Sequence, residues 1–237
     1  MLDLLFPRFC LGCNREGFYL CEDCQGLLNI CEFDYCLCSQ NHQTIPPNSK
    51  KGKCSRCQNK KLSGLYFALP YKEGNLTKKL IHQFKYEPYL KDLSKTLASI
   101  LIEHFIISKK NTNEIWQNSV LIPVPLFHKK FKERGYNQSE ELAKELSKVL
   151  EVPVNSDILI KTRQTESQMK LKKEEREKNL AGAFTIKNSD RSNLSLFEKI
   201  FLVDDVYTTG STMEECAKVL CQAGAKSVWG ITIAREN

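Results

Sequence analysis

Long apolar runs are missing from this 237-residue sequence: none approaches the roughly 20 residues that a membrane-spanning helix needs. The first ten residues, MLDLLFPRFC, have no basic segment and too short an apolar run for a secretory signal peptide. We therefore expect a cytoplasmic protein, either free or held peripherally at the inner face of the membrane. In that reducing compartment, its eleven cysteines are expected to bind metal rather than to form disulfides.

Internal repeats, beyond the paired cysteines, and low-complexity tracts are missing too. Apolar residues make up 41% of the chain, enough to bury the core of one medium domain, with or without a small appendage. The net charge of +7 is a mild excess. It is compatible with a phosphate-rich ligand or a nucleic acid, and equally with a surface charge that only keeps the protein in solution.

The cysteines divide the chain into two parts. Nine of them lie between Cys10 and Cys57, and the other two, Cys216 and Cys221, are expected to be buried thiols. The composition changes near Lys60, after which the pattern becomes that of an ordinary α/β protein. The sequence therefore predicts a Cys-rich zinc-ribbon module over 1–60 and an α/β domain over 61–237.

Within the first part, the spacing of the cysteines indicates two sets of four thiolates. Each C-x2-C turn presents two thiolates to one tetrahedral zinc ion. The first set is Cys10, Cys13, Cys21 and Cys24. The second set is Cys36, Cys38, Cys54 and Cys57, and its first pair is C-x-C. Cys31 or His42 could substitute in the second set, or that ion could be absent; reduced thiols without metal are the alternative for both sets.

The second part alternates strands with helices. Strands are predicted over 64–71, 119–125, 199–203 and 227–234, from short β-branched and apolar runs. Helical spacing of apolar residues follows at 76–84 and 93–105, and a further helix is expected over 211–222. Asn137 begins another helix, with Glu140 placed as in a capping box. This order predicts a mostly parallel sheet covered by helices on both faces.

The stretch IFLVDDVYTTGST, residues 200–212, carries the chemistry. Asp204 and Asp205 follow a buried strand, and ligands of parallel sheets bind beyond the carboxyl ends of strands. The next turn contains four hydroxyl residues and Gly210 and leads into a helix N-terminus, which suits a phosphate. It has neither a Walker lysine nor a G-x-G-x-x-G pattern. Carboxylates beside a phosphate need hydrogen-bond donors, and the hydroxyls of a sugar 5-phosphate would supply them.

The same thirteen residues closely resemble the phosphoribosyl pyrophosphate motif of type I phosphoribosyltransferases. VPLFHKKFKERGYNQS (124–139), KTRQTESQMKLKKEEREKNLAGAF (161–184) and the paired cysteines further resemble the ComF or GntX-like family of competence-associated proteins. The resemblance implies that Asp204 and Asp205 hold the ribose hydroxyls. It also implies that the 5-phosphate is held by Val206, Thr208, Thr209, Gly210, Ser211 and Thr212.

The resemblance implies further site residues in three segments. The pyrophosphate would be bound by Arg134, Gly135, Asn137 and Gln138, with Lys129, Lys130 and Lys132 as weaker candidates. A loop over 161–178 would close over the reaction with Lys161, Arg163, Thr165 and Gln168. Lys85 would face the phosphates, whereas His82 and Tyr86 are expected to pack. For each residue the alternative is an ordinary basic or mobile surface.

Three functions follow as hypotheses. The first is a phosphoribosyltransferase that uses phosphoribosyl pyrophosphate and Mg2+ in natural competence, DNA uptake or nucleotide-linked metabolism. The second is a single-stranded DNA-binding competence factor, working with the competence helicase machinery, that keeps the pocket for binding or sensing without turnover. The third is a structural zinc adaptor, which the intact acids at 204–205 disfavour. The sequence does not identify the acceptor. In type I phosphoribosyltransferases a separate hood forms the pocket for the base. Because little chain follows 227–234, we expect the zinc module and residues 61–90 to form this hood over the carboxyl edge of the sheet.

Overall fold

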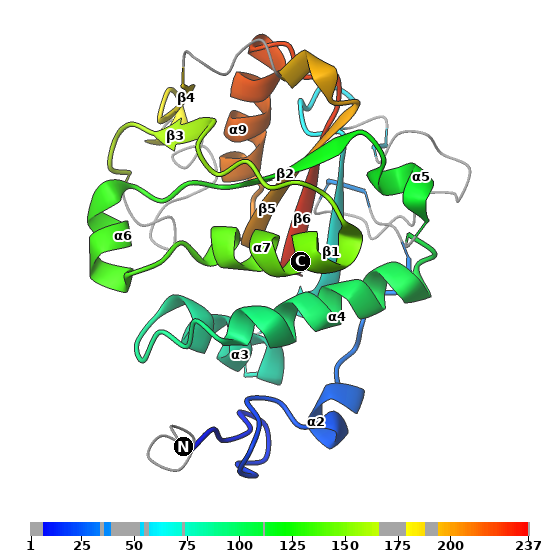
Figure 1. The fold of residues 1–237 in the computed structure, drawn as a ribbon, viewed down its shortest axis with the longest axis vertical. Coiled ribbons are helices and arrows are strands. Elements are labelled where there is room, and N and C mark those ends of the chain that lie inside the picture. The colour runs from blue at the N-terminus through cyan, green and yellow to red at the C-terminus, as the bar shows by residue number, and fades with distance from the viewer. Residues whose placement is uncertain are drawn as a thin grey trace.

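A four-stranded parallel sheet forms the centre of the computed structural model (Figure 1). The structure describes residues 7–33, 36–38, 53–54, 57–72, 74–110, 112–165, 179–187 and 194–236. The strands, in the spatial order β1-β6-β5-β2, are β1 (Gly64–Tyr71), β6 (Val228–Glu236), β5 (Lys199–Tyr207) and β2 (Ser119–Pro123). The predicted parallel α/β fold is therefore confirmed.

Helices cover both faces of the sheet. One face is covered by α3 (Leu76–Lys85), α4 (Leu93–Ile107) and α7 (Gln138–Leu150). The other face carries α9 (Ser211–Gln222) and the antiparallel pair β3 (Leu159–Lys161) and β4 (Phe184–Ile186). Within the described ranges, three short α-helices lie outside these layers: α2 (Glu22–Gly26), α5 (Asn113–Trp116) and α6 (His128–Arg134). No helix in the described part of the chain is long and apolar enough to span a membrane.

The predicted helix starting at Asn137 is present as α7, but its N-terminal cap differs from the expected box. The Asn137 side chain accepts a hydrogen bond from the Ser139 N–H at 3.1 Å. The Glu140 carboxylate instead lies 2.7 Å from Lys144 Nζ, one turn along the helix. The cap is therefore one-sided, and Asn137 alone fixes where α7 begins.

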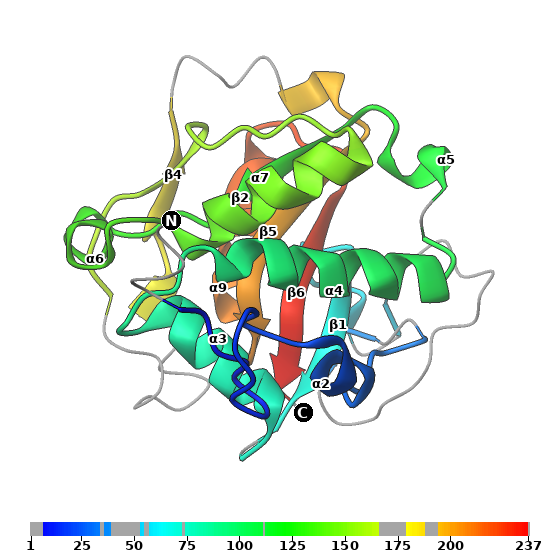
Figure 2. The same cartoon turned by 60° about the horizontal axis from the view of Figure 1, so that its bottom comes forward.

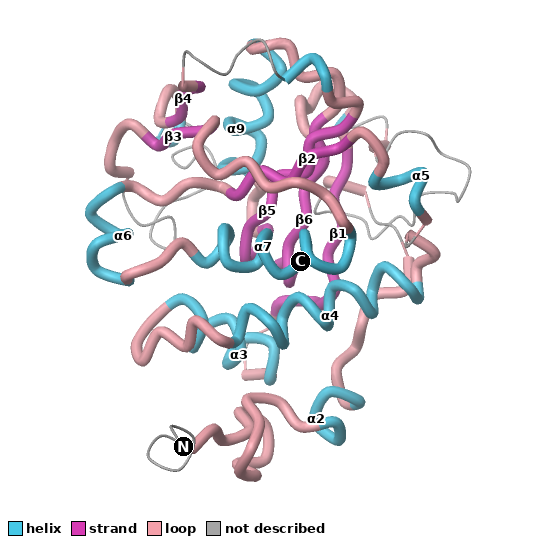
Figure 3. The backbone as a smooth tube through the Cα atoms, viewed as in Figure 1, coloured by secondary structure: helices cyan, strands magenta, loops and turns pink. Residues whose placement is uncertain are grey.

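The two cysteine sets lie in different cores. Cys10, Cys21 and Cys24 belong to the cluster that also fills the space between the sheet and the α3, α4 and α7 layer, and their loop lies on the outer side of α3 and α4 (Figure 1). Cys36 and Cys57 belong to the cluster on the α9 face. Figure 3 shows that the N-terminal part is mostly loop, with α2 as its labelled helix. The predicted domain boundary near residue 60 stays a prediction.

The carboxyl ends of the strands define the edge where the conspicuous polar residues gather. The arrows of β5 and β6 point toward the end of the molecule where α3 and α2 lie (Figure 2). The pairing of β2 with β5 stops at Pro123–Val203, whereas β5 and β6 remain paired as far as Tyr207–Arg235. Because α7 precedes β5 on one face and α9 follows it on the other, β5 ends at a topological switch point.

Candidate functional site

Asp204 and Asp205 project from β5 beyond the end of β2. Asp205 is 2% exposed, and each of its carboxylate oxygens lies 3.0 Å from Lys85 Nζ. Gln138 Nε2 donates to Asp205 Oδ2 at 3.0 Å. Asp204 Oδ1 accepts hydrogen bonds from Ser139 Oγ and from the Asp205 N–H, both at 2.9 Å. The end of α3 and the start of α7 thus hold the two acids in place.

These contacts shift the protonation of the site. Burial, and then the charge of Asp205, raise the pKa of Asp204 to about 6, from an ordinary value of 3.8. Burial alone would lower the pKa of Lys85, but the charges of Asp205 and Asp204 outweigh it, so that pKa is raised. Lys85 therefore stays protonated beside a carboxyl group that gains its proton more readily than usual.

Several cations converge next to the acids. Arg134, at the end of α6, donates to Gln138 Oε1, and Gln138 in turn contacts Asp205. Partial desolvation and the charges of Lys85 and Arg134 lower the pKa of Lys130, which lies on the exposed helix α6. Burial and the charge of Lys130 lower the pKa of Lys161. Mutual repulsion among clustered cations marks a place where a polyanion would be stabilised.

The turn after β5 has the features expected of a phosphate-binding loop, and we call residues 208–212 the phosphate loop. Gly210 has a φ of 76° and is the N-cap residue of α9, a helix of 12 residues. The hydroxyls of Thr209 and Ser211 lie 2.9 Å apart, and the Ser211 N–H donates to Thr209 Oγ1 at 3.4 Å. N–H groups in the first turn of a helix have no partner within the helix, so this loop can donate to an anion.

Other predicted residues lie nearby without contacting the acids. Both polar atoms of the Asn137 side chain are hydrogen-bonded: Oδ1 accepts from the Ser139 N–H, and Nδ2 donates to Val124 O at 3.1 Å. Arg163 is exposed and donates to Ala181 O at 2.8 Å, and Thr165 accepts from Lys161 Nζ at 2.9 Å. Gly135 ends α6 with a φ of 79°. The ligand roles of these residues stay predictions. Gln168 and His42 lie outside the described residues.

Ser139 was not predicted, although it is bonded to Asp204. It directly follows Asn137 and Gln138 in the segment already singled out, so its position at the helix start could have drawn attention to it.

The two cysteine sets each form a compact group. In each, all four sulfur atoms lie within 4.8 Å of one another. Neighbouring sulfurs in the first group are 3.6–3.7 Å apart, as for Cys10–Cys21 and Cys13–Cys21. A tetrahedron with Zn–S bonds of 2.3 Å has edges of about 3.8 Å. The four donors of each group therefore fit a zinc ion.

The second group contains the C-x-C pair itself. Cys38 Sγ lies 3.6 Å from Cys36 Sγ and 3.4 Å from Cys54 Sγ, and the Cys36–Cys57 distance is a shorter 3.0 Å. Cys31 lies outside this group of four. The unusual spacing is thus compatible with four converging thiols.

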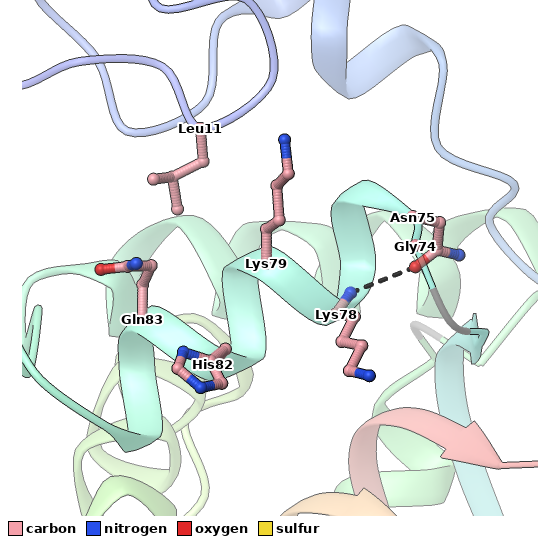
Figure 4. A pocket seen from close by; sticks show the side chains of 7 residues that line it. All are labelled: Leu11, Gly74, Asn75, Lys78, Lys79, His82 and Gln83. Carbon is pink, nitrogen blue, oxygen red and sulfur yellow. Dashed lines mark hydrogen bonds between the residues drawn. The ribbon is translucent and has the colours of Figure 1, made fainter.

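A cavity of about 370 Å³ lies between the first cysteine loop and α3. Its lining consists of Leu11, Gly74, Asn75, Lys78, Lys79, His82 and Gln83 (Figure 4). Lys79 extends from α3 on the side where Leu11 lies, whereas Lys78 and His82 extend from the opposite side of the helix. Burial raises the pKa of Tyr71 at the carboxyl end of β1, and the charges of Lys78 and Lys85 oppose this shift. The cavity thus lies along α3, the helix whose last residue, Lys85, contacts Asp205.

Comparisons with known proteins agree with this arrangement. Competence protein F of Haemophilus influenzae is 35% identical over 157 residues, which cover 65% of this chain and 67% of that protein. The chain belongs to the ComF family. The DNA utilization protein YhgH of Escherichia coli K12 is 28% identical over 229 residues, covering 95% of this chain and 96% of that protein. Competence protein ComFC of Bacillus subtilis is 36% identical over 118 residues, covering 49% and 45%.

The C-terminal part of this ComF protein also matches a second family model. Residues 137–237 match the phosphoribosyl transferase domain. That range includes both acids, the phosphate loop, α9 and β6. The resemblance to phosphoribosyltransferases, first visible in residues 200–212, is therefore confirmed.

Proposed function

We propose that the protein binds phosphoribosyl pyrophosphate together with Mg2+ and transfers the phosphoribosyl group. The observation that carries this proposal is the position of Asp204 and Asp205. They lie at the switch point of the sheet, between the phosphate loop and the cluster of Lys85, Lys130 and Arg134. A ribose with a phosphate at one end and a pyrophosphate at the other needs these three environments in this order.

Each part of the ligand has a matching group in the proposed complex. The two carboxylates accept hydrogen bonds from the ribose hydroxyls, and the phosphate loop donates to the 5-phosphate. The cation cluster neutralises the pyrophosphate. Mg2+, which prefers phosphate and hydroxyl oxygens, would supply further charge neutralisation between ribose and pyrophosphate. Lys85 must then exchange its contact with Asp205 for one with the ligand.

The proposed reaction is a substitution at ribose C1. A nucleophile forms a bond to C1 as the bond from C1 to the pyrophosphate oxygen breaks, and the electron pair leaves with pyrophosphate. The positive charge that develops on the ribose is stabilised by the carboxylates, and the leaving charge by the cations. The chain's main contribution is to position the reactants.

The acceptor is proposed to enter through the cavity between the first cysteine loop and α3. This placement follows the expectation that the N-terminal module overhangs the carboxyl edge of the sheet. It is supported by α3 itself, which carries both cavity residues such as Lys78 and the acid-binding Lys85.

Calorimetric titration of phosphoribosyl pyrophosphate and Mg2+ into the zinc-loaded protein tests the binding proposal. We expect Asp204→Asn and Asp205→Asn each to weaken binding at least tenfold, because each loses a charged acceptor. The matched control is Asp157→Asn, which removes one exposed carboxylate with the same change of shape. Binding that survives both variants, or a folded wild type that binds nothing, would overturn the proposal.

Single-stranded DNA binding is a second candidate function, favoured by the surface of α6. This helix has no buried residue and presents Phe131, 46% exposed, between Lys130 and Lys132. An exposed aromatic ring among cations suits base stacking with phosphate contacts. The names of the relatives, a competence protein and a DNA utilization protein, agree with a role in handling DNA. Competence helicase machinery remains a proposed partner.

Binding of an oligothymidylate, measured against salt concentration, tests this candidate. We expect Phe131→Ala to weaken binding by about 1–3 kcal/mol and Lys132→Ala to reduce the salt slope by about one. The control is Phe18→Ala, which removes another exposed ring, 56% exposed, from the first cysteine loop. Equal losses in the two phenylalanine variants would contradict a specific role for α6.

A further inference from the structure

Tyr207, the last residue of β5, connects the phosphate loop with the second cysteine group. Its side chain is buried, and its hydroxyl donates to the carbonyl oxygen of Leu37 at 3.5 Å. Leu37 is the residue between Cys36 and Cys38. The same ring lies against Gly210, since a Cβ on that glycine would come within 2.2 Å of the Tyr207 hydroxyl oxygen. One ring thus contacts both a metal-binding turn and the turn that begins α9.

Arg235, paired with Tyr207 across β5 and β6, makes a second connection. It is 4% exposed, and its two terminal nitrogens donate to Cys36 O at 2.7 Å and Cys38 O at 3.0 Å. Its guanidinium lies 5.7 Å from the centre of the Tyr207 ring. Burying a cation against neutral carbonyls is costly. A divalent ion with four thiolates has a net charge of −2, so a loaded second group would supply a counter-charge to Arg235.

Glu214, in the first turn of α9, makes a third connection. Its carboxylate accepts from the Lys61 N–H at 2.5 Å and from the Leu62 N–H at 3.2 Å. This segment leaves the second cysteine group soon after Cys57. The neighbouring Lys60 also donates from Nζ to the Tyr207 hydroxyl, at 3.3 Å. The start of α9 is therefore attached to both ends of the segment that carries the second group.

We propose that metal binding at the second cysteine group sets the conformation of the phosphate loop, with Tyr207 as the positioning residue between them. The first cysteine group has no such role, because it belongs to the core on the other face of the sheet. The part that concerns ligand affinity rests on the proposed function; the coupling of metal to loop conformation does not.

Thermodynamic linkage gives the proposal a quantitative form. If metal at the second group raises the affinity of the loop for a sugar phosphate, the sugar phosphate raises the affinity for that metal by the same factor. We expect a factor of about 10, within the usual range of such couplings. If the second cysteine group only stabilised the fold, a ligand at the phosphate loop would not change its metal affinity, and removing the Tyr207 hydroxyl would not matter for that affinity.

Amide hydrogen exchange tests the structural coupling in the full chain loaded with zinc. Cys54→Ser and Cys13→Ser each remove one thiol, from the second and the first group respectively, and native mass spectrometry confirms the loss of one ion. We expect faster exchange over 207–214 in Cys54→Ser and unchanged exchange there in Cys13→Ser. Unchanged exchange over 207–214 in Cys54→Ser, with its ion lost, would overturn the proposal.

Tyr207→Phe keeps the eight thiols of the two cysteine groups and the ring beside Gly210. It therefore covers the case in which Cys54→Ser does not fold. Removing the hydroxyl cuts the bonds to Leu37 and Lys60, and we expect faster exchange over 207–214 with unchanged exchange over 93–105. Exchange as slow as in the wild type would count against Tyr207 as the connection.

Ribose 5-phosphate is the probe for the second test. In equilibrium competition with a chelator, saturating ribose 5-phosphate should raise the wild type's affinity for one of the two ions about tenfold, and Tyr207→Phe should abolish that protection. If ribose 5-phosphate binds the wild type without protecting either ion, the coupling is wrong. If it does not bind at all, the proposed function fails, while the exchange experiment still decides whether metal and loop are coupled.

Discussion

Asp205 is an almost fully buried carboxylate shared between a lysine from α3 and a glutamine from α7. Lys85 is its charged partner, with Nζ 3.0 Å from each carboxylate oxygen. In the proposed complex, Lys85 would exchange this ion pair for contacts with the ligand. This makes Lys85 important to the stability of the free protein as well as to binding.

Lys85→Met should lower the free energy of unfolding by about 2–4 kcal/mol, because it leaves the Asp205 charge buried without its ion partner. The Lys85 side chain is 31% exposed, so the loss should stay below that of a fully buried pair. Lys91→Met is the control: Lys91 Nζ lies 3.2 Å from Glu141, but its side chain is 56% exposed, and the expected loss is below about 1 kcal/mol. Urea unfolding at pH 7.5 measures both, and equal losses would contradict the importance of the pair.

Asp204 should make the stability of the free protein fall as the pH rises. Its pKa of about 6 in the folded state lies above the ordinary value of 3.8, so between these values the folded state binds a proton that the unfolded chain has released. The stabilising effect of this proton is therefore complete below about pH 4 and is lost as the pH rises through about 6.

Asp204→Asn removes this titration while keeping an acceptor for Ser139. We expect the variant to be more stable than the wild type at pH 7.5, by on the order of 1 kcal/mol, and equal to it near pH 4. Urea unfolding at both pH values measures the difference. A variant no more stable than the wild type at pH 7.5 would contradict the raised pKa.

At the level of single residues, the sequence singled out the two acids through a recognisable motif and Lys85 through a segment that resembles the family's, and their ligand roles stay predictions. It could not predict that Ser139, Tyr207 and Arg235 would meet their partners, since those contacts join segments distant in the chain. Tyr207 occupies a variable position of the motif, and its importance is visible only through what lies beside it.

The turn between β5 and α9 shows how an element can depend on one missing side chain. Gly210 and Gly182 both have a positive φ, of 76° and 69°. A Cβ on Gly210 would collide with the Tyr207 ring, whereas a Cβ on Gly182 would meet nothing within 4 Å. The two glycines therefore separate the cost of the backbone conformation from the cost of the collision.

Gly182→Ala should cost about 1 kcal/mol, which is the strain of a left-handed alanine. Gly210→Ala should cost at least about 2 kcal/mol more, since the ring beneath must move, and it should also weaken sugar-phosphate binding. Thermal unfolding and titration with ribose 5-phosphate measure the two effects. Similar losses of stability in both variants would indicate that the ring yields easily.

Among the elements, the sequence located the four main strands and the principal helices, because their apolar periodicity is regular. It ended the third strand at residue 203, whereas β5 continues through both acids to Tyr207. Charged residues are rare in strands, so propensity alone ends the strand too early. Pairing with β6 extends it, and that pairing cannot be seen locally.

On the scale of the whole molecule, the two cysteine groups belong to two separate cores, on opposite sides of one sheet. The sequence indicated the groups by their spacing but could not tell which face each would join. Removal of one ion should therefore destabilise the core that contains its cysteine group and leave the other core intact.

Cys10→Ser should remove one zinc ion and lower the free energy of unfolding by roughly 3–5 kcal/mol, a part of the ~10–16 kcal/mol that binding can supply at a structural zinc site. Because Cys10 belongs to the same core as residues of α3 and α4, hydrogen exchange should accelerate in these helices and stay slow in α9. Zinc content and exchange are measured on the same sample. Uniformly faster exchange across both faces would show that the cores are not separable.

The spatial order of the strands also affects how the chain can fold during its synthesis. β6 lies between β1 and β5, yet it is made last of the four (Figure 1). At about 5–20 residues per second, β1 waits on the order of ten seconds or more for its neighbour. During that time the ribosome presents an apolar strand with both edges open, a species that chaperones bind and that aggregates when they are scarce.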